Sequence, residues 1–291
     1  MGTLLGHLLP GSFFISFSLW WMVSIFRKYF TSKLDPKSQM FECTASFTSQ
    51  KWPSVPLEAY VKLLATIAGI IGETITGFKW VDHQWKFANL MPNGHHIMMF
   101  SFFALNAIAD LATFYKVKCL PKDTDYVTAV IAAGVECYLF ANHLHGRQSL
   151  DVKLHTCLVI VILFCVIASL AEMVGNRHDV RYGLFRSCCY LWQGTWFFQA
   201  GFILYPPKGF PIWNSDSMTT NMIMDLMFVG HLMFSIFVLI MTGLYLYNET
   251  RKSHKNDKSM KSNGGLEYHA LISTQNSEVE ESVDYYKNNI A

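Results

Sequence analysis

The chain has 291 residues, of which 52% are hydrophobic and only 15% are charged, and its formal net charge is +2. Soluble domains have roughly a quarter charged residues, so this chain has too little charge to solvate a globule of its size. Its apolar residues also come in blocks of about bilayer length. The composition excludes a disordered chain, a collagen-like repeat and a disulfide-stapled secreted scaffold, and it predicts an integral membrane protein.

Seven apolar segments have the length of membrane-spanning helices. A helix needs about 20 residues to cross about 30 Å of hydrocarbon, and a helix also satisfies its own backbone polar groups there. We therefore predict an all-α fold, a seven-transmembrane helix bundle over residues 1–249. The predicted spans are Leu8–Phe26, Tyr60–Phe78, His96–Tyr115, Tyr126–Asn142, Leu154–Val174, Gly183–Tyr205 and Met222–Leu246.

The distribution of Lys and Arg predicts the orientation of the bundle. Sixteen of these residues lie in the connections after odd-numbered spans and in the C-terminal segment, whereas five lie at the opposite ends of the spans. Because cytoplasmic segments carry the excess of positive charge, the N-terminus is expected outside or in a lumen and the C-terminus in the cytosol. Cys43 and Cys119, the two cysteines in connections, then face the reducing cytosol.

Residues 250–291 are predicted to form a disordered cytosolic tail, because they are rich in Lys, Ser, Asn and Glu and cannot bury enough apolar surface to fold. Within them, Tyr268 and Leu271 form the pattern of a tyrosine-based sorting signal. So short a pattern also arises by chance. The predicted partners are the lipid bilayer and adaptor proteins that read this signal, and no nucleic acid is expected. The sequence does not fix the oligomeric state.

Histidines gather on the predicted outer side of the bundle, although the topology was derived from Lys and Arg alone. Neutral imidazole is the commonest metal ligand, and a carboxylate can complete a zinc site or orient a ligating histidine. We therefore predict a metal site that opens to the lumen, with zinc as the expected ion. The candidate ligands come from four helices: His95, His96, His143, His145, His155 and His231.

Such a site with one open position could activate water for the hydrolysis of a lipid-like substrate. Glu73 on the second span and Glu136 on the fourth lie in the same outer half and are the candidate general bases. A haem b held between two histidines on facing helices is a second interpretation of the cofactor. Whether the protein is an enzyme is left open by the sequence.

Two other hypotheses use the same residues. In a non-enzymatic trafficking or scaffold protein, the buried polar groups only hold the helices together through hydrogen bonds. A protein that conducts protons or a solute would instead show a continuous polar path to the cytosol, for which Asp110 and Glu172 lie in the inner half of the bundle.

Several motifs, in order over residues 1–250, resemble the transmembrane protein 45 family. They are Gly6–Gly11, Gly94-His95-His96, Asn142–Arg147, Gln193–Phe202 and Tyr205-Pro206-Pro207. The resemblance implies a seven-helix protein of Golgi, endosomal or plasma membranes, without a settled biochemical activity. Seven-helix zinc hydrolases of the alkaline ceramidase type are a looser analogy. They carry paired histidines on the last helix, whereas the last span here has only His231.

Overall fold

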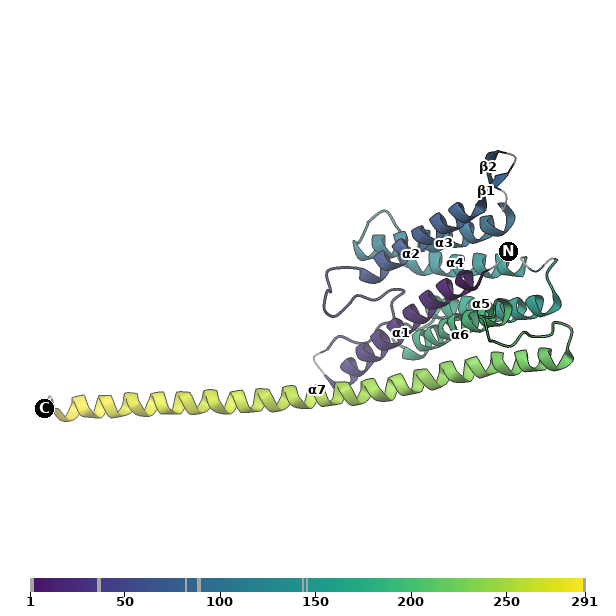
Figure 1. Cartoon of the computed structure of the whole chain (residues 1–291). Helices are drawn as coiled ribbons and strands as arrows, with labels where there is room; N and C mark the ends of the chain where they lie inside the picture. The colour runs from purple at the N-terminus through teal and green to yellow at the C-terminus, as the bar shows by residue number, and fades with distance from the viewer. Residues whose placement is uncertain are drawn as a thin grey trace.

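The computed structural model describes residues 3–35, 38–81, 83–87, 90–142, 144 and 146–289, with side chains except those of 81, 90–92 and 257–289. This part of the chain forms seven helices and one two-stranded hairpin (Figure 1). The elements are α1 (Leu4–Leu34), α2 (Leu57–Gly77), β1 (Phe78–Val81), β2 (Gln84–Phe87), α3 (Leu90–Phe114), α4 (Thr124–Ala141), α5 (Ser149–Val174), α6 (Val180–Leu204) and α7 (Met218–Asn289).

The prediction of an all-helical bundle is confirmed, since each predicted span overlaps one helix of the structure. The C-terminal ends agree to within one residue for the five spans from the second to the sixth, whereas α1 and α7 continue well beyond the predicted ends Phe26 and Leu246. Six of the described helices are long and apolar enough to cross a membrane, and α6 is the exception. The physical reason is that α6 packs against α1, α5 and α7 and buries polar residues such as Arg186, Ser187 and Gln193. Its composition therefore reflects the protein interior and not a lipid-facing surface.

Local signals set several helix ends. Thr3 caps α1, because its side-chain oxygen accepts a hydrogen bond from the Gly6 N–H at 3.0 Å. Asp179 caps α6 in the same way and accepts from the Arg181 N–H at 3.0 Å. Pro206 and Pro207 follow the C-terminal end of α6, where they cannot continue the helix.

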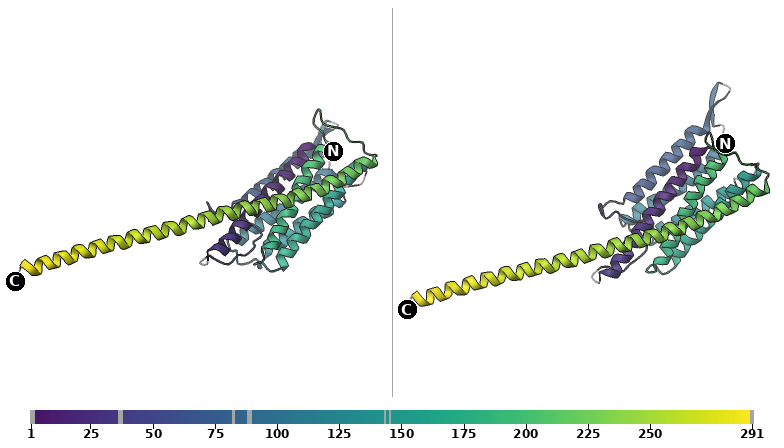
Figure 2. Two further views of the ribbon diagram at one scale, coloured as in Figure 1. Left: turned by 90° about the horizontal axis from the view of Figure 1, so that it is seen from below. Right: turned by 60° about the horizontal axis from the view of Figure 1, so that its bottom comes forward.

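The bundle has two distinct ends. The N-terminus and the β1–β2 hairpin lie at one end, which we call the hairpin end, and α7 leaves the bundle at the other, which we call the tail end (Figures 1 and 2). At the tail end, the Cys43 N–H donates to the Arg177 carbonyl at 2.8 Å, and Arg177 pairs with Asp123 at 2.8 Å. These contacts bring the three connections after α1, α3 and α5 together.

The β1–β2 hairpin was not predicted, and the sequence analysis assigned Phe78 to the end of the second span. The strands are antiparallel, with Phe78 opposite Phe87 and Trp80 opposite Trp85. The Trp80 and Trp85 rings are exposed and meet edge to face, with centroids 5.5 Å apart. Cross-strand aromatic pairs of this kind stabilise a short hairpin, so residues 78–81 and 84–87 form a two-stranded element outside the bundle.

The backbone of α7 continues as helix to Asn289, far beyond the bundle (Figure 1), whereas the sequence predicts disorder over 250–291. A helix that projects alone depends on its own propensity, because tertiary packing normally supplies most helical stability. The division between a membrane domain over 1–249 and a separate cytosolic tail stays a prediction. The proposed sorting residues Tyr268 and Leu271 lie on this helix, and their side chains are outside the described part of the chain.

Helices α1 and α6 approach each other closely at two glycines. A Cβ atom added to Gly194 would lie 2.8 Å from the Ile15 nitrogen and 2.9 Å from the Gly11 carbonyl oxygen. A Cβ atom on Gly11 would lie 2.9 Å from the Gly194 carbonyl oxygen. Small residues of this kind let helix backbones approach closely within a membrane, so α1 is held directly against the backbone of α6.

We expect Gly194→Ala to destabilise the protein by about 1–3 kcal/mol, because the new methyl group meets backbone that cannot move away without separating the helices. Thermal unfolding of the purified protein in one detergent, followed by size-exclusion chromatography, measures the change. Gly134→Ala is the matched control, since nothing lies within 4 Å of its Cβ position and alanine favours helix. Equal unfolding temperatures for the two variants would contradict the proposed contact.

Candidate functional site

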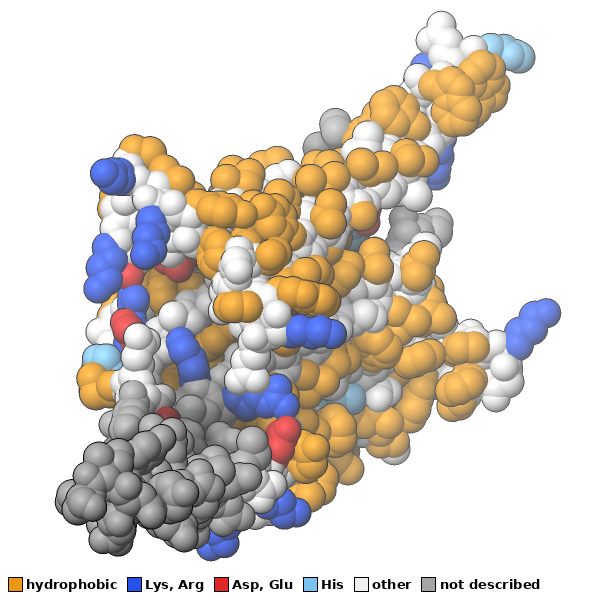
Figure 3. Space-filling view, turned by 90° about the vertical axis from the view of Figure 1, so that its left-hand side faces the viewer, with side chains coloured by type: hydrophobic (Ala, Val, Ile, Leu, Met, Phe, Trp, Pro, Cys, Tyr) orange, Lys and Arg blue, Asp and Glu red, His pale blue; other side chains and the backbone are white. Residues whose placement is uncertain are grey.

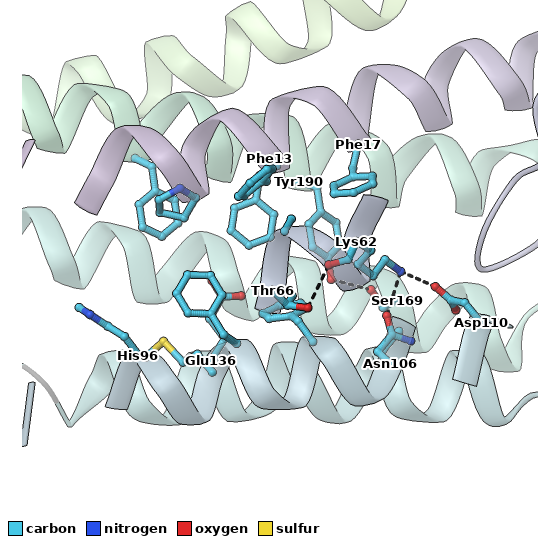
Figure 4. A pocket seen from close by; sticks show the side chains of 18 of the residues that line it. Phe13, Phe17, Lys62, Thr66, His96, Asn106, Asp110, Glu136, Ser169 and Tyr190 are labelled. Carbon is cyan, nitrogen blue, oxygen red and sulfur yellow. Dashed lines mark hydrogen bonds and ion pairs between the residues drawn. The ribbon is translucent and has the colours of Figure 1, made fainter. Parts of the chain in front are cut away.

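A cavity of about 140 Å³ lies inside the bundle. Residues of α1 line one side of it, residues of α2, α3 and α4 line the other, and α5 and α6 contribute a few side chains. The helix packing explains its position, because α1 packs on α6 and α7 while α2 packs on α3, and α3 on α4. Figure 4 shows that side chains from both sides point into this space.

The walls of the cavity are mainly aromatic. Phe14 is at the centre of this lining, with ring centroids 5.8 Å from Tyr190, 5.8 Å from Phe197 and 6.1 Å from Phe103. Phe197 in turn meets Phe140 edge to face at 5.7 Å. These five rings come from α1, α3, α4 and α6, so the apolar wall is built only when the bundle assembles.

Lys62 and Asp110 form an ion pair at the tail end of the cavity. The Lys62 ammonium donates to an Asp110 carboxylate oxygen at 2.5 Å and to the Asn106 side-chain oxygen at 3.0 Å (Figure 4). The Asn106 amide then donates to the Asp125 carbonyl at 3.0 Å and to Thr128 at 3.1 Å. The pair therefore connects α2, α3 and α4 at one depth.

Arg186 and Glu172 form a second, completely enclosed pair, in which the guanidinium donates to the carboxylate. The Tyr126 hydroxyl also donates to Glu172 at 3.0 Å. Arg186 makes a hydrogen bond of 3.2 Å to the Thr44 carbonyl and lies over the Trp21 ring at 4.2 Å. A buried ion pair needs such additional bonds, because both charges lose their hydration.

Glu58 completes the tail-end charge network, by which we mean Glu58, Lys62, Asp110, Glu172 and Arg186. Its carboxylate accepts hydrogen bonds from the indoles of Trp20 at 2.9 Å and Trp21 at 2.7 Å, and from the Phe47 N–H at 2.8 Å. Through these bonds, Glu58 holds the α1–α2 connection and the Trp20–Trp21 segment of α1 against the start of α2.

Glu58, Lys62 and Arg186 were not predicted as members of this network. Lys62 and Arg186 lie in the first turns of the predicted spans Tyr60–Phe78 and Gly183–Tyr205 and were interpreted only as basic residues. The depth of Lys62 and Arg186 within the predicted spans could have indicated these pairs, because a cation inside a span needs a carboxylate at the same depth. Asp110 and Glu172 lie at the matching level on neighbouring helices, as the two ion pairs show.

A smaller polar group lies at the hairpin end of the cavity. A Glu73 carboxylate oxygen lies 3.0 Å from His96 Nδ1, and its other oxygen accepts from the Asn93 amide at 2.8 Å. Glu73 and His96 both line the cavity. The structure thus brings one predicted general base beside one predicted metal ligand, on the facing helices α2 and α3.

Glu136, the second predicted general base, lies near the middle of the cavity and is only 3% exposed. Its Oε1 accepts a hydrogen bond from the Gln193 amide at 2.8 Å. Its Oε2 has no hydrogen-bond partner among the described residues. Glu136 and Glu73 therefore have different surroundings, since Glu73 has the His96 imidazole beside it and Glu136 has no such neighbour in the described part of the chain.

The other candidate ligands have separate partners. His155 lies 2.7 Å from an Asp151 carboxylate oxygen, and its ring centroid is 5.7 Å from that of His7. His231 Nε2 lies 3.4 Å from the Gln199 side-chain oxygen. His95 lies beside His96 on α3, whereas His143 and His145 are outside the described residues.

Among the side chains that the structure describes, no three His, Cys, Asp or Glu residues are grouped closely enough to hold a metal ion. The predicted six-histidine site depends on His143 and His145, so it stays a prediction. The contact between His7 and His155 was not expected as a pair, because the candidate ligand set contained only His155. To predict this contact, one must know that the first and fifth spans are neighbours in the bundle, and the sequence alone does not give the helix arrangement.

Comparisons with known proteins agree with this architecture. Residues 122–246 match the model of a family described as a family of unknown function, DUF716. Transmembrane epididymal protein 1 of Rattus norvegicus is 22% identical over 254 residues, which cover 84% of this chain and 80% of the relative. Transmembrane epididymal protein 1A of Mus musculus is 23% identical over 259 residues, with the same shares of 84% and 80%. The human transmembrane epididymal protein 1 is 26% identical over 155 residues, which cover 52% of this chain and 54% of the relative.

The chain is a multi-pass membrane protein. The family match covers α4, α5, α6 and the bundle part of α7, and the similarity to the two rodent proteins extends over most of the chain. The finer resemblance to the transmembrane protein 45 family stays an interpretation of the motifs. Two of these motifs contain Gly11 and Gly194, the glycines at the α1–α6 contact.

Removing one charge of the Arg186–Glu172 pair should strongly destabilise the fold. We expect Arg186→Met to cost about 3–5 kcal/mol, because Glu172 is then left buried without a cation. Adding Glu172→Gln to that variant should restore part of the loss. Thermal unfolding of the single and double variants in one detergent measures this coupling.

Arg27→Met provides the control for this prediction. Arg27 and Glu249 form a pair whose side chains are 38% and 46% exposed, so its loss should cost no more than about 1 kcal/mol. A similar loss of stability in Arg27→Met and Arg186→Met would contradict the importance of burial.

Proposed function

We propose that this chain is a seven-span membrane protein with its hairpin end outside or in a lumen, and that the cavity within the bundle binds a small amphipathic molecule. The cavity itself is the observation that supports this function. Ligand sites in helical bundles lie between the helices, with mainly apolar walls and a few convergent polar groups. The aromatic lining, with Glu73 and His96 at one end and Lys62 and Asp110 at the other, fits that description.

The size of the cavity limits the ligand. Its volume of about 140 Å³ is close to that of an engineered apolar cavity of about 150 Å³ that binds benzene. A single aromatic ring or a short alkyl chain with one polar group therefore fits without moving the helices. A larger lipid would need α1 and α2 to separate, and these two helices make few direct contacts.

Two observations support seven spans and this orientation. The enclosed position of α6 accounts for its low hydropathy, and α6 runs between the two ends of the bundle as the other helices do (Figure 1). Viewed from the tail end, several Lys and Arg side chains lie on the face toward the viewer, while hydrophobic side chains cover the flanks (Figure 3). The positive-inside rule assigns such an end to the cytosol.

Cysteine labelling tests this orientation. Cys119 is exposed in the α3–α4 connection, so a membrane-impermeant maleimide should label it only after the cytosolic side is opened. Burial raises the pKa of the Cys43 thiol to about 12, so Cys43, on the same side, should stay unlabelled near neutral pH because the thiolate is the reactive form. Cys119→Ser is the control that removes the signal. Labelling of Cys119 in intact cells would reverse the proposed orientation.

Filling the cavity tests the binding function. Ala129 lines the cavity on α4, and we expect Ala129→Phe to reduce binding of 2-phenylethanol by about ten-fold or more because the added ring occupies the site. Equilibrium dialysis of the full chain in lipid nanodiscs, against empty nanodiscs, measures binding. Ile131→Phe is the matched control, since Ile131 is 47% exposed on the outside of the same helix. Equal binding by both variants, or no binding by the unmodified chain, would contradict the proposal.

The remaining sequence-based hypotheses stay predictions. Metal-assisted lipid hydrolysis and haem binding depend on a shared histidine site, for which the described residues offer pairs such as His96 with Glu73. Adaptor binding at Tyr268 and Leu271 concerns a segment outside the cavity. Residence in Golgi, endosomal or plasma membranes concerns the cell compartment, about which the cavity gives no information. The cavity supports ligand binding more directly than it supports any of these.

A further inference from the structure

We propose that the cavity is a site for a small organic cation, an ammonium group that carries one aromatic ring or a short alkyl chain, with Glu136 as its counter-ion. This inference depends on the cavity-binding function proposed above and names the chemical class of the ligand. It is carried by the Glu136 carboxylate, which lines the cavity, is almost fully buried and has one oxygen without a partner among the described residues.

Glu136 differs from the other acidic residues that line the cavity in having no basic partner among the described residues. Asp110 has the Lys62 ammonium, Glu172 has the Arg186 guanidinium and Glu73 has the His96 imidazole. Among the described residues, no Lys, Arg or His side chain forms an ion pair with Glu136. A buried carboxylate that is ionised without a partner costs several kcal/mol, so a ligand cation would supply the charge that this position lacks.

The hydrogen bonding of Glu136 leaves room for a donor on one side only. Gln193 donates to Oε1 and holds the carboxylate toward the centre of the bundle. Oε2 is the atom that remains without a donor. An ammonium group has N–H donors and no acceptor, so it can donate to Oε2 without displacing the Gln193 donor at Oε1. The Gln193 side-chain oxygen, which also has no partner among the described residues, is a second acceptor close to this position.

Aromatic rings adjoin the carboxylate. Phe140 lies four residues after Glu136 on α4, and Phe197 lies four residues after Gln193 on α6, so each ring shares a helix face with one of the two polar partners. Phe140 and Phe197 meet each other at 5.7 Å. The faces of such rings attract cations, and their edges and faces also accept the apolar part of a ligand.

The neighbouring titratable groups do not provide a competing positive charge. Cys137 directly follows Glu136 on α4, while Cys165 on α5 and Tyr190 on α6 lie near Glu136 on neighbouring helices. Thiols and phenols are neutral or negative when they titrate. An anionic ligand would meet Glu136 without a compensating cation, so the charge at the middle of the cavity favours an ammonium ligand over a carboxylate ligand.

The test compares a cation with its neutral counterpart of nearly the same shape. Binding of 2-phenylethylamine and of 2-phenylethanol to the full chain in lipid nanodiscs is measured by equilibrium dialysis against empty nanodiscs. We expect the amine to bind about ten-fold or more tightly than the alcohol, which corresponds to one charge-assisted bond. Equal affinities for the two probes would overturn the cation site without any variant being needed.

Glu136→Gln tests the residue itself and keeps an oxygen that can accept the Gln193 bond. We expect this variant to weaken amine binding by about ten-fold or more and to leave alcohol binding within about two-fold. Glu73→Gln is the matched control, because it makes the same change at a cavity carboxylate that already has His96 beside it. We expect Glu73→Gln to keep the preference for the amine. If Glu73→Gln loses that preference while Glu136→Gln keeps it, the assignment to Glu136 is overturned.

The outcomes separate this inference from the function on which it depends. If the alcohol binds and Ala129→Phe abolishes its binding, but the amine gains nothing from Glu136, the cavity binds ligands and the cation assignment is wrong. If neither probe binds to the unmodified chain, cavity binding itself fails for ligands of this size. Thermal unfolding of each variant confirms that a loss of binding does not come from a loss of fold.

Discussion

The arrangement of the whole bundle depends on the close approach of α1 to α6 at Gly11 and Gly194. In a bilayer, apolar surface alone does not drive helices together, so close packing and hydrogen bonds decide which helices pair. Because α1 is committed to α6 and α7, it does not pack tightly on α2. Aromatic side chains such as Phe14 and Phe103 fill part of the space that results, and the rest of that space is the cavity.

Buried charge then fixes the tail end of that space. Lys62 with Asp110 joins α2 to α3, and Arg186 with Glu172 joins α6 to α5, so the two pairs involve four helices. In a low-dielectric interior, a satisfied network of this kind specifies one arrangement, because any shift leaves a charge uncompensated. Glu136 is the contrast, since among the described residues its partner is the Gln193 amide and no cation pairs with it. The carboxylates at the ends of the cavity thus each have a basic partner, although Asp110 Oδ1 has no hydrogen-bond partner among the described residues.

The sequence predicted the helices well because bilayer thickness imposes a length on each apolar segment. It predicted less of the site, because a pair such as Lys62 with Asp110 depends on which helices are neighbours, and hydropathy carries no such information. The β1–β2 hairpin was missed because Phe78 reads equally well as the end of an apolar helix. The same limit applies to the histidines. Their common depth stays a prediction from the spans, and depth alone does not determine that His155 meets His7 while His231 lies beside Gln199.

The aromatic segment of α6 shows how one helix can serve both the packing and the site. The Trp192 and Trp196 indoles donate to the carbonyls of Phe228 on α7 and Leu154 on α5, at 3.0 and 3.1 Å. These bonds hold α5 and α7 against α6, while Phe197 lines the cavity and Gln193 donates to Glu136, another residue of the lining. A helix that is fixed on three sides needs no lipid-facing apolar surface, which is why its hydropathy is low. A ligand that entered between α1 and α2 would therefore contact α1 and α6, which are packed on each other. Any movement needed to admit the ligand would then occur in α2, α3 and α4. These helices contact α1 in part through Glu58 and the Trp20 and Trp21 indoles.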